Sequence, residues 1–186
     1  MDLLIVTLYS YILGSIPFGL ILTRFAGLGD VRKIGSGNIG ATNVLRTGNK
    51  FLAALTLLLD GFKGTLSILL TIQYFNELTY YCAVVVFLAH IFPVWLKFKG
   101  GKGVATFIGS LLAINIYLSG IFIASWLLIL LIFRISAVSA LLGYLVTTIA
   151  ALIFFDQKIF LLIFFYFITS IFTHRQNISS LLKGKF

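Results

Sequence analysis

Cysteine, proline and charged residues are all scarce in this sequence. Its 186 residues include 1 cysteine, 2 prolines and only 10% charged residues. The lone Cys82 excludes an internal disulfide and a cluster of thiolate ligands, and its apolar neighbours favour a small buried hydrophobe. Soluble domains carry about 25% charged residues, so this composition excludes a water-soluble surface. With 2 histidines and 5 Asp and Glu residues, we expect neither a metal site nor a cofactor.

The sequence instead has long apolar runs, and 60% of its residues are hydrophobic. A backbone in hydrocarbon must have its hydrogen bonds satisfied by protein, so membrane spans are helices or closed barrels. The runs are continuous rather than alternating segments of about ten residues, which favours helices. The first run, Leu3 to Phe25, has no positive n-region and is longer than the apolar part of a signal peptide. We therefore interpret it as a retained first span.

The stretch from Val104 to Phe133 can be interpreted as one span or as two. As one helix it would be about 45 Å long, well beyond a hydrocarbon core of about 30 Å. As two helices it would need a turn near Asn115 to Gly120, where Asn115, Ser119 and Gly120 are plausible turn residues. The other predicted spans are 3–25, 51–72, 78–96, 135–155 and 159–172.

The positions of the 14 Lys and Arg residues decide between these alternatives. If the N-terminus is outside and the stretch crosses twice, all of them except Lys63 and Lys158 lie on the cytoplasmic side. A single crossing moves Arg134 and the basic tail outside, against the positive-inside rule. The net charge of +9 thus reflects membrane orientation, and we expect no nucleic-acid partner. The sequence predicts an all-α polytopic membrane protein with seven transmembrane helices, a cytoplasmic C-terminus and a single domain, 1–186.

The first polar segment matches the pattern G-x-G-x-x-G through its glycines. No strand–helix–strand unit surrounds it, and Ala41 stands where a P-loop needs lysine. Glycines still let backbone N–H groups approach an anion, and an arginine adds a planar fork that fits phosphate oxygens. The alternative is an ordinary flexible loop. The candidate residues of this segment are Gly35, Ser36, Gly37, Asn38, Gly40, Thr42, Asn43 and Arg46.

The second polar segment follows Lys97 and is rich in glycine. Its glycines would place exposed backbone around a cation, which again suits an anion. The alternative is a basic juxtamembrane loop that binds anionic lipid headgroups. The candidate residues are Gly100, Gly101, Lys102, Gly103 and Thr106.

The third polar segment contains His174 and Asn177. They are three residues apart, so both lie on one face if the segment is helical. The alternative is a solvated basic tail.

Two charged residues, Asp60 and Lys63, lie near the centre of a predicted span. A lone charge there costs at least about 2.5–3.5 kcal/mol, so such groups face the bundle and are paired. We predict a structural ion pair rather than a catalytic one. His90, near the end of the next span, is expected to be a structural histidine.

Together these segments resemble the bacterial acyl-phosphate:glycerol-3-phosphate acyltransferase family over essentially the whole chain. The motifs that carry the resemblance are Gly14 to Gly19, Ser36 to Asn43, Asp60 to Gly64, His90 and Pro93 with Gly100 to Thr106, and His174 with Asn177 and Ile178. The resemblance implies a multi-pass enzyme of the bacterial cytoplasmic (inner) membrane with its N-terminus outside and its site at the cytoplasmic face. It would transfer a fatty acyl group from acyl phosphate to the 1-hydroxyl of glycerol 3-phosphate, giving lysophosphatidic acid and phosphate. Membrane lipids would surround the protein, and we expect the protein to be a monomer.

Residue roles are carried over by position. Ser36, Arg46, Lys102, His174 and Asn177 are predicted to be catalytic. Predicted substrate-binding residues are Gly37, Asn38, Gly40, Thr42, Asn43, Gly100, Gly101, Gly103 and Thr106.

Our working hypothesis divides these residues between the two substrates. The segment from Ser36 to Asn43 would contact acyl phosphate. Arg46, Lys102, His174 and Asn177 would bind glycerol 3-phosphate. The proton of the attacking hydroxyl would pass to the substrate phosphate rather than to His174, because nearby phosphates favour a charged imidazole.

The sequence departs from the family pattern in its tail. Ser180 and Phe186 stand where the family commonly has Arg and Glu, which puts a carboxylate role for the tail in doubt.

Other function classes fit the sequence less well. A small transporter for an anionic solute needs polar groups near the membrane midplane, where only Asp60 and Lys63 lie. A non-catalytic membrane anchor has no use for glycine-rich loops at three cytoplasmic sites. An acyltransferase that uses a thioester donor is a further alternative.

Overall fold

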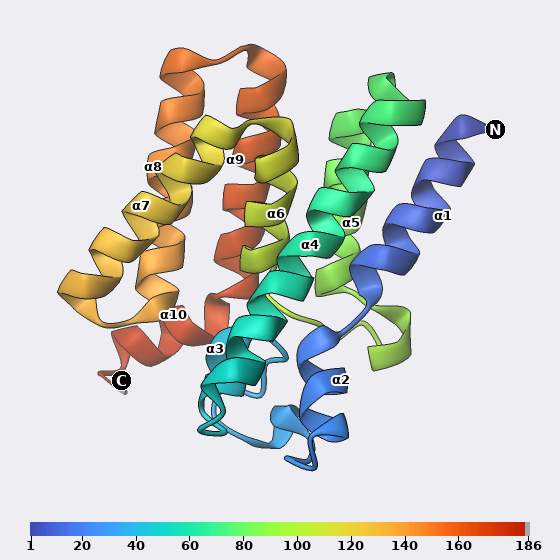
Figure 1. The fold of residues 1–186 in the computed structure, drawn as a ribbon. Coiled ribbons are helices and arrows are strands. Elements are labelled where there is room, and N and C mark those ends of the chain that lie inside the picture. Colours follow the sequence, from blue (N-terminus) through green and yellow to red (C-terminus); the bar gives the residue numbers. More distant parts are fainter. Residues whose placement is uncertain (185–186) are drawn as a thin grey trace. The chain divides into compact units, whose positions relative to one another are not determined.

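The computed structural model describes residues 1–184, which are helical with no β-strand (Figure 1). The α-helices are α1 (Asp2–Ser15), α2 (Phe18–Phe25), α3 (Ala41–Leu45), α4 (Lys50–Tyr74), α5 (Thr79–Ile91), α6 (Val104–Ile114), α7 (Ile116–Phe133), α8 (Ser136–Phe154), α9 (Gln157–Thr173) and α10 (Arg175–Leu182). The short 3-10 helices are η1 (Val31–Lys33), η2 (Asn76–Leu78) and η3 (Val94–Leu96).

Short polar side chains mark where three long helices begin. The side-chain oxygen of Asn49 accepts from the N–H of Leu52 at 3.0 Å at the start of α4. Asp156 caps α9 in the same way. Asn115 accepts from Leu118 at 3.0 Å at the start of α7. Such caps satisfy N–H groups that lack a partner within the helix, so the break predicted at Asn115 is confirmed.

The first apolar run is bent rather than straight. It forms α1 and α2, which meet at 40° across Ile16 and Pro17. Proline has no N–H to donate and its ring crowds the preceding turn. The predicted first span, Leu3 to Phe25, is therefore a bent pair of helices, and Pro17 is the sequence signal for the bend.

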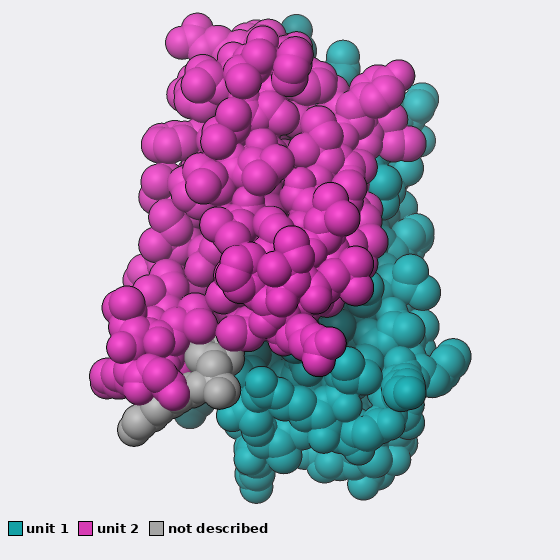
Figure 2. Space-filling model, turned by 90° about the vertical axis from the view of Figure 1, so that its left-hand side faces the viewer, with its two compact units in different colours: residues 1–114 teal, residues 115–186 magenta. Residues whose placement is uncertain are grey.

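Residues 1–114 form one compact unit and residues 115–186 a second, drawn in two colours in Figure 2. In the first unit α4 is central and packs against α1, α2, α3, α5 and α6. α1 also packs closely against α5 (Figure 1). In the second unit α8 lies against both α7 and α9.

Glycines bring α4 and α6 into close contact. A Cβ at Gly109 would overlap the backbone of Gly61, and one at Gly64 would lie 2.6 Å from the carbonyl oxygen of Thr106. Small residues of this kind let helices in a membrane approach closely. The contact fixes the start of α6, and hence the loop before it, against α4.

Within residues 1–184, four helices are long and apolar enough to cross a membrane, or up to six if each bent pair counts as one span. The bent pairs are α1 with α2 and α9 with α10. α6 has 11 residues, which span only about 17 Å. The membrane-embedded, all-helical class is therefore established, while the seventh crossing and the orientation of the termini stay predictions.

Candidate functional site

Ionic contacts organise the start of the first polar loop. Arg32 donates to Asp30 at 2.9 and 2.6 Å, and Arg24 donates to the same carboxylate at 3.2 Å. The Arg32 guanidinium holds the pKa of Asp30 well below its usual value. Asp30 therefore stays ionised, and these two arginines are occupied by it.

Asn43 is the internal anchor of this loop. Its amide nitrogen donates to the carbonyls of Val31, Ile34 and Asn38 at 2.8, 3.2 and 2.7 Å, and its amide oxygen accepts from the N–H of Ser36 at 3.0 Å. The side chain is buried. This geometry favours a role for Asn43 in shaping the loop, and its predicted contact with substrate stays a prediction.

The rest of the loop is more open. Ser36, Gly37 and Thr42 are exposed, while Asn38 is half-buried and its side-chain oxygen accepts from the N–H of Gly40 at 2.9 Å. Gly35 has a left-handed φ of 51°, and a Cβ there would overlap the side chains of Asn43 and Arg46. The exposed Arg46 therefore lies directly against the glycine turn.

The second loop differs from expectation. The N–H of Gly100 donates to the carbonyl of Ile91 at 2.9 Å, and the N–H of Gly101 donates to that of His90 at 3.0 Å. The prediction of exposed backbone here is therefore wrong, because these N–H groups satisfy the end of α5. Gly103 has a left-handed φ of 88°, and its backbone lies so close to the ring of Phe87 that a Cβ would overlap the ring.

Thr106 also has a packing role. Its hydroxyl is buried and donates to the carbonyl oxygen of Asp60 at 3.0 Å, which joins α6 to α4. The N–H groups of Gly100 and Gly101 and the hydroxyl of Thr106 are thus bonded within the protein, and they shape the loop that carries Lys102. Their predicted contact with substrate is not required by this geometry.

The charge of Arg46 acts on Lys102, although the two residues belong to different loops. Partial burial and the positive charge of Arg46 together lower the pKa of Lys102 from 10.5 to about 8. Two cations close together repel each other unless an anion lies between or beside them. The pair, with the exposed Ser36 and Gly37 on the neighbouring turn, defines a candidate anion-binding site in the first unit.

The ion pair predicted in the first unit is present. Lys63 donates to Asp60 at 2.7 Å, and both side chains are buried. The Lys63 ammonium also donates to the carbonyl of Ile16 at 2.8 Å and lies 2.9 Å from Nδ1 of His90. His90 is buried near the end of α5, as expected of a structural histidine, but its contact with Lys63 was not foreseen.

His174 and Asn177 belong to the second unit. His174 joins α9 to α10, is buried, and its Nδ1 lies 2.9 Å from the carbonyl oxygen of Ser170. A carbonyl oxygen only accepts hydrogen bonds, so Nδ1 carries a proton. Asn177 is half-buried in the first turn of α10. Ser180 also lies in α10, and Phe186 is outside the described residues.

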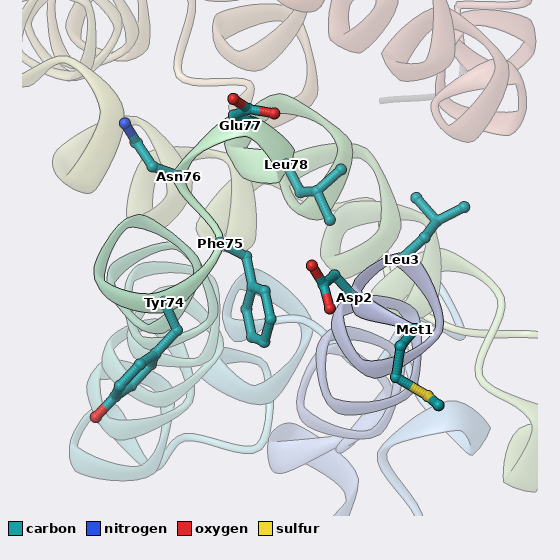
Figure 3. Close-up of a pocket in the computed structure, with 8 residues that line it drawn as sticks. All are labelled: Met1, Asp2, Leu3, Tyr74, Phe75, Asn76, Glu77 and Leu78. Carbon is teal, nitrogen blue, oxygen red and sulfur yellow. The ribbon is translucent and has the colours of Figure 1, made fainter.

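A separate hollow of about 470 Å³ lies where α1 begins and α4 ends (Figure 3). It is at the opposite end of α4 from the loop that carries Arg46, and none of the predicted site residues lines it. Its lining residues are Met1, Asp2, Leu3, Tyr74, Phe75, Asn76, Glu77 and Leu78.

The described residues thus form an all-helical integral membrane protein whose polar loops carry a candidate anion-binding site. The family model for glycerol-3-phosphate acyltransferase matches residues 4–184. This chain belongs to that family and is an acyltransferase.

Relatives from bacteria match nearly the whole chain. It is 50% identical over 182 residues to a glycerol-3-phosphate acyltransferase of Mesorhizobium japonicum, an alignment that covers 98% of this chain and 93% of that protein. It is 46% identical over 188 residues to one of Wolbachia pipientis wMel, which covers 100% and 97%.

Solved structures agree with the fold. The crystal structure of PlsY, an integral membrane glycerol 3-phosphate acyltransferase, in its glycerol 3-phosphate form, superposes with a TM-score of 0.93 at 30% identity and covers 100% of this chain and 94% of that one. A second structure of PlsY, in its lysophosphatidic acid form, gives 0.91 at 29% identity with the same coverage.

Proposed function

We propose that this protein transfers a fatty acyl group from acyl phosphate to the 1-hydroxyl of glycerol 3-phosphate, giving lysophosphatidic acid and inorganic phosphate. The observation that carries the proposal is a cationic site in a member of the glycerol-3-phosphate acyltransferase family, where Arg46 lies against the Gly35 turn and its charge acts on Lys102. Both substrates are phosphate compounds, so the site must gather negative charge. The two PlsY structures are a glycerol 3-phosphate form and a lysophosphatidic acid form, and these compounds are a substrate and a product of this reaction.

The chemistry needs positioning more than a strong base. The hydroxyl oxygen of glycerol 3-phosphate attacks the carbonyl carbon of the acyl phosphate, the bond from that carbon to the phosphate oxygen breaks, and phosphate leaves. Phosphate is a good leaving group, so orientation and charge stabilisation supply most of the rate. Arg46 and Lys102 neutralise phosphate charge, and Ser36 with Gly37 orients the donor from the exposed turn.

In this mechanism the hydroxyl proton passes to an oxygen of the acyl phosphate, and His174 with Asn177 orients glycerol 3-phosphate. The carbonyl of Ser170 fixes the proton of His174 on Nδ1. Nε2 then accepts a hydrogen bond when the ring is neutral and donates one when it is charged. Two substrate phosphates favour the charged ring, which supports an orienting role for His174.

We further propose that the whole chain acts as one monomeric domain of the bacterial inner membrane, with seven crossings and its site at the cytoplasmic face. The break at Asn115 supports two crossings between the loop of Lys102 and Arg134, with the short α6 as the first. The close glycine contacts of α6 with α4 support its place inside the bundle. The charges of Asp60 and Lys63, the two that the sequence places deep in a span, pair with each other.

The donor is the part of this proposal that an assay decides. Purified protein in lipid vesicles is given glycerol 3-phosphate with either palmitoyl phosphate or palmitoyl coenzyme A, and lysophosphatidic acid is measured. We expect product with palmitoyl phosphate alone. Product from the thioester at a comparable rate would overturn the assignment of the donor while leaving the acyltransferase family unaffected.

A further inference from the structure

The ammonium of Lys63 joins three separate segments of the first unit. An ammonium has three protons to donate, and three acceptors surround this one. They are the carboxylate of Asp60 on α4, the carbonyl of Ile16 in the break between α1 and α2, and Nδ1 of His90 on α5. Because Lys63 donates to Nδ1, the proton of a neutral His90 lies on Nε2. Lys63 thereby fixes both the tautomer and the orientation of the buried ring.

The opposite edge of the same ring supports the loop before α6. A Cβ at Gly101 would overlap Nε2 of His90 and lie 2.7 Å from Cε1 and 3.0 Å from Cδ2. The backbone carbonyl of His90 also accepts from the N–H of Gly101 at 3.0 Å. The chain therefore lies against the Nε2 edge of the imidazole at the residue immediately before Lys102.

We propose that His90, held by Lys63, is a positioning residue that sets the path of residues 100–103 and with it the place of the Lys102 ammonium. Glycine at 101 is needed for contact with the ring. The proposal rests on the proposed function in one respect, the binding of glycerol 3-phosphate by Lys102. Nothing in it depends on which acyl donor is used.

A pair of variants tests the contact between ring and loop. Gly101→Ala keeps the N–H but places a methyl group against the His90 ring, so the loop must move. His90→Asn keeps an acceptor near the position of Nδ1 for Lys63 and removes the ring atoms that the methyl group meets. The shorter side chain should therefore accommodate alanine at 101.

Steady-state kinetics of the full-length protein in vesicles gives the readout. We expect Gly101→Ala to raise KM for glycerol 3-phosphate by at least about tenfold, because Lys102 no longer meets the phosphate. His90→Asn alone should raise KM by about threefold, because the loop loses the ring that sets its path, and an unchanged KM in this variant would contradict the proposal. Gly101→Ala combined with His90→Asn should have the same KM as His90→Asn, because the methyl group no longer meets a ring. Loss of folded protein alone would lower the maximal rate and leave KM unchanged.

Gly120→Ala is the matched control, since a Cβ there meets no atom within 4 Å, and it should behave as wild type. An unchanged KM in Gly101→Ala, or a double variant as impaired as Gly101→Ala, would overturn the proposal. The assay uses whichever acyl donor the wild-type protein accepts. If the acyl donor has been assigned wrongly, the wild-type protein shows it by using a different donor. If the positioning role is wrong, only the KM values of the variants show it.

Discussion

Arg46 and Lys102 lie close enough for the charge of one to depress the pKa of the other. The lysine sits on the loop before α6 and the arginine at the end of α3, yet the pKa of Lys102 is lowered to about 8 by burial and by this neighbour. The lowered pKa reflects an excess of positive charge that a bound phosphate would relieve. Lys102 therefore carries its charge near neutral pH but loses it in a range that an assay can reach.

The first prediction concerns pH. A lysine with a pKa of about 8 is about nine-tenths charged at pH 7 and about one-tenth charged at pH 9. The charged form binds phosphate, so kcat/KM for glycerol 3-phosphate should fall about tenfold between these pH values, since this ratio reports the free enzyme. Lys102→Arg stays charged throughout and should give a flatter profile. The prediction fails if both proteins show the same decline.

Removal of the charge itself is the second prediction. Lys102→Ala should lose a charge-assisted contact worth about 1.5–3 kcal/mol, or roughly tenfold to a hundredfold in kcat/KM. Insertion into the membrane should be normal, as checked by the yield of the full-length protein in the membrane fraction. Lys99→Ala, an exposed lysine of the same loop, is the matched control and should keep wild-type kinetics. Near-normal activity of Lys102→Ala would refute the assignment.

A third prediction separates orientation from base catalysis at His174. His174→Gln retains a hydrogen-bond donor but cannot act as a general base. If His174 orients glycerol 3-phosphate, this variant should keep measurable turnover, with its main defect in KM for glycerol 3-phosphate. Complete loss of turnover at saturating substrate, with binding of both substrates intact, would make His174 the general base instead.

Topology gives the fourth prediction. A cysteine at Tyr117, which is 74% exposed at the start of α7, should react with an impermeant thiol reagent from outside the cell. The wild-type protein is the control, because its only cysteine, Cys82, is buried. A reporter fused after Phe186, beyond the described residues, should be cytoplasmic. A periplasmic reporter would contradict seven crossings and would separate His174 from the membrane face that carries Lys102.

Local sequence signals predicted most of the fold. Continuous apolar runs predicted helices, and Asn115 was among the residues expected at the turn between two of them. The pairing of Asp60 with Lys63 followed from the cost of a lone charge in hydrocarbon. Each of these inferences concerns residues close together in sequence, where short-range geometry decides the outcome.

The internal contacts of the candidate site could not be predicted in the same way. The sequence identified Asn43 and Gly101 as polar or flexible loop residues, and both types suit an anion site. Their actual partners, the carbonyls around Asn43 and the ring of His90, depend on how distant segments pack. The tertiary structure therefore decides which N–H and side-chain groups are still able to donate a hydrogen bond to a substrate.

The buried ammonium of Lys63 has a consequence for how the protein is made. Of the four single helices that could cross a membrane, α4 has the lowest mean hydropathy, 1.5, because it carries Asp60 and Lys63. Two of the three acceptors of Lys63 belong to other segments, one before α4 in the chain and one after it. When α4 leaves the ribosome, the carbonyl of Ile16 already exists but His90 has not yet been synthesised. We therefore expect α4 to stay at the insertion machinery beside α1 until α5 arrives, so that these helices enter the lipid together.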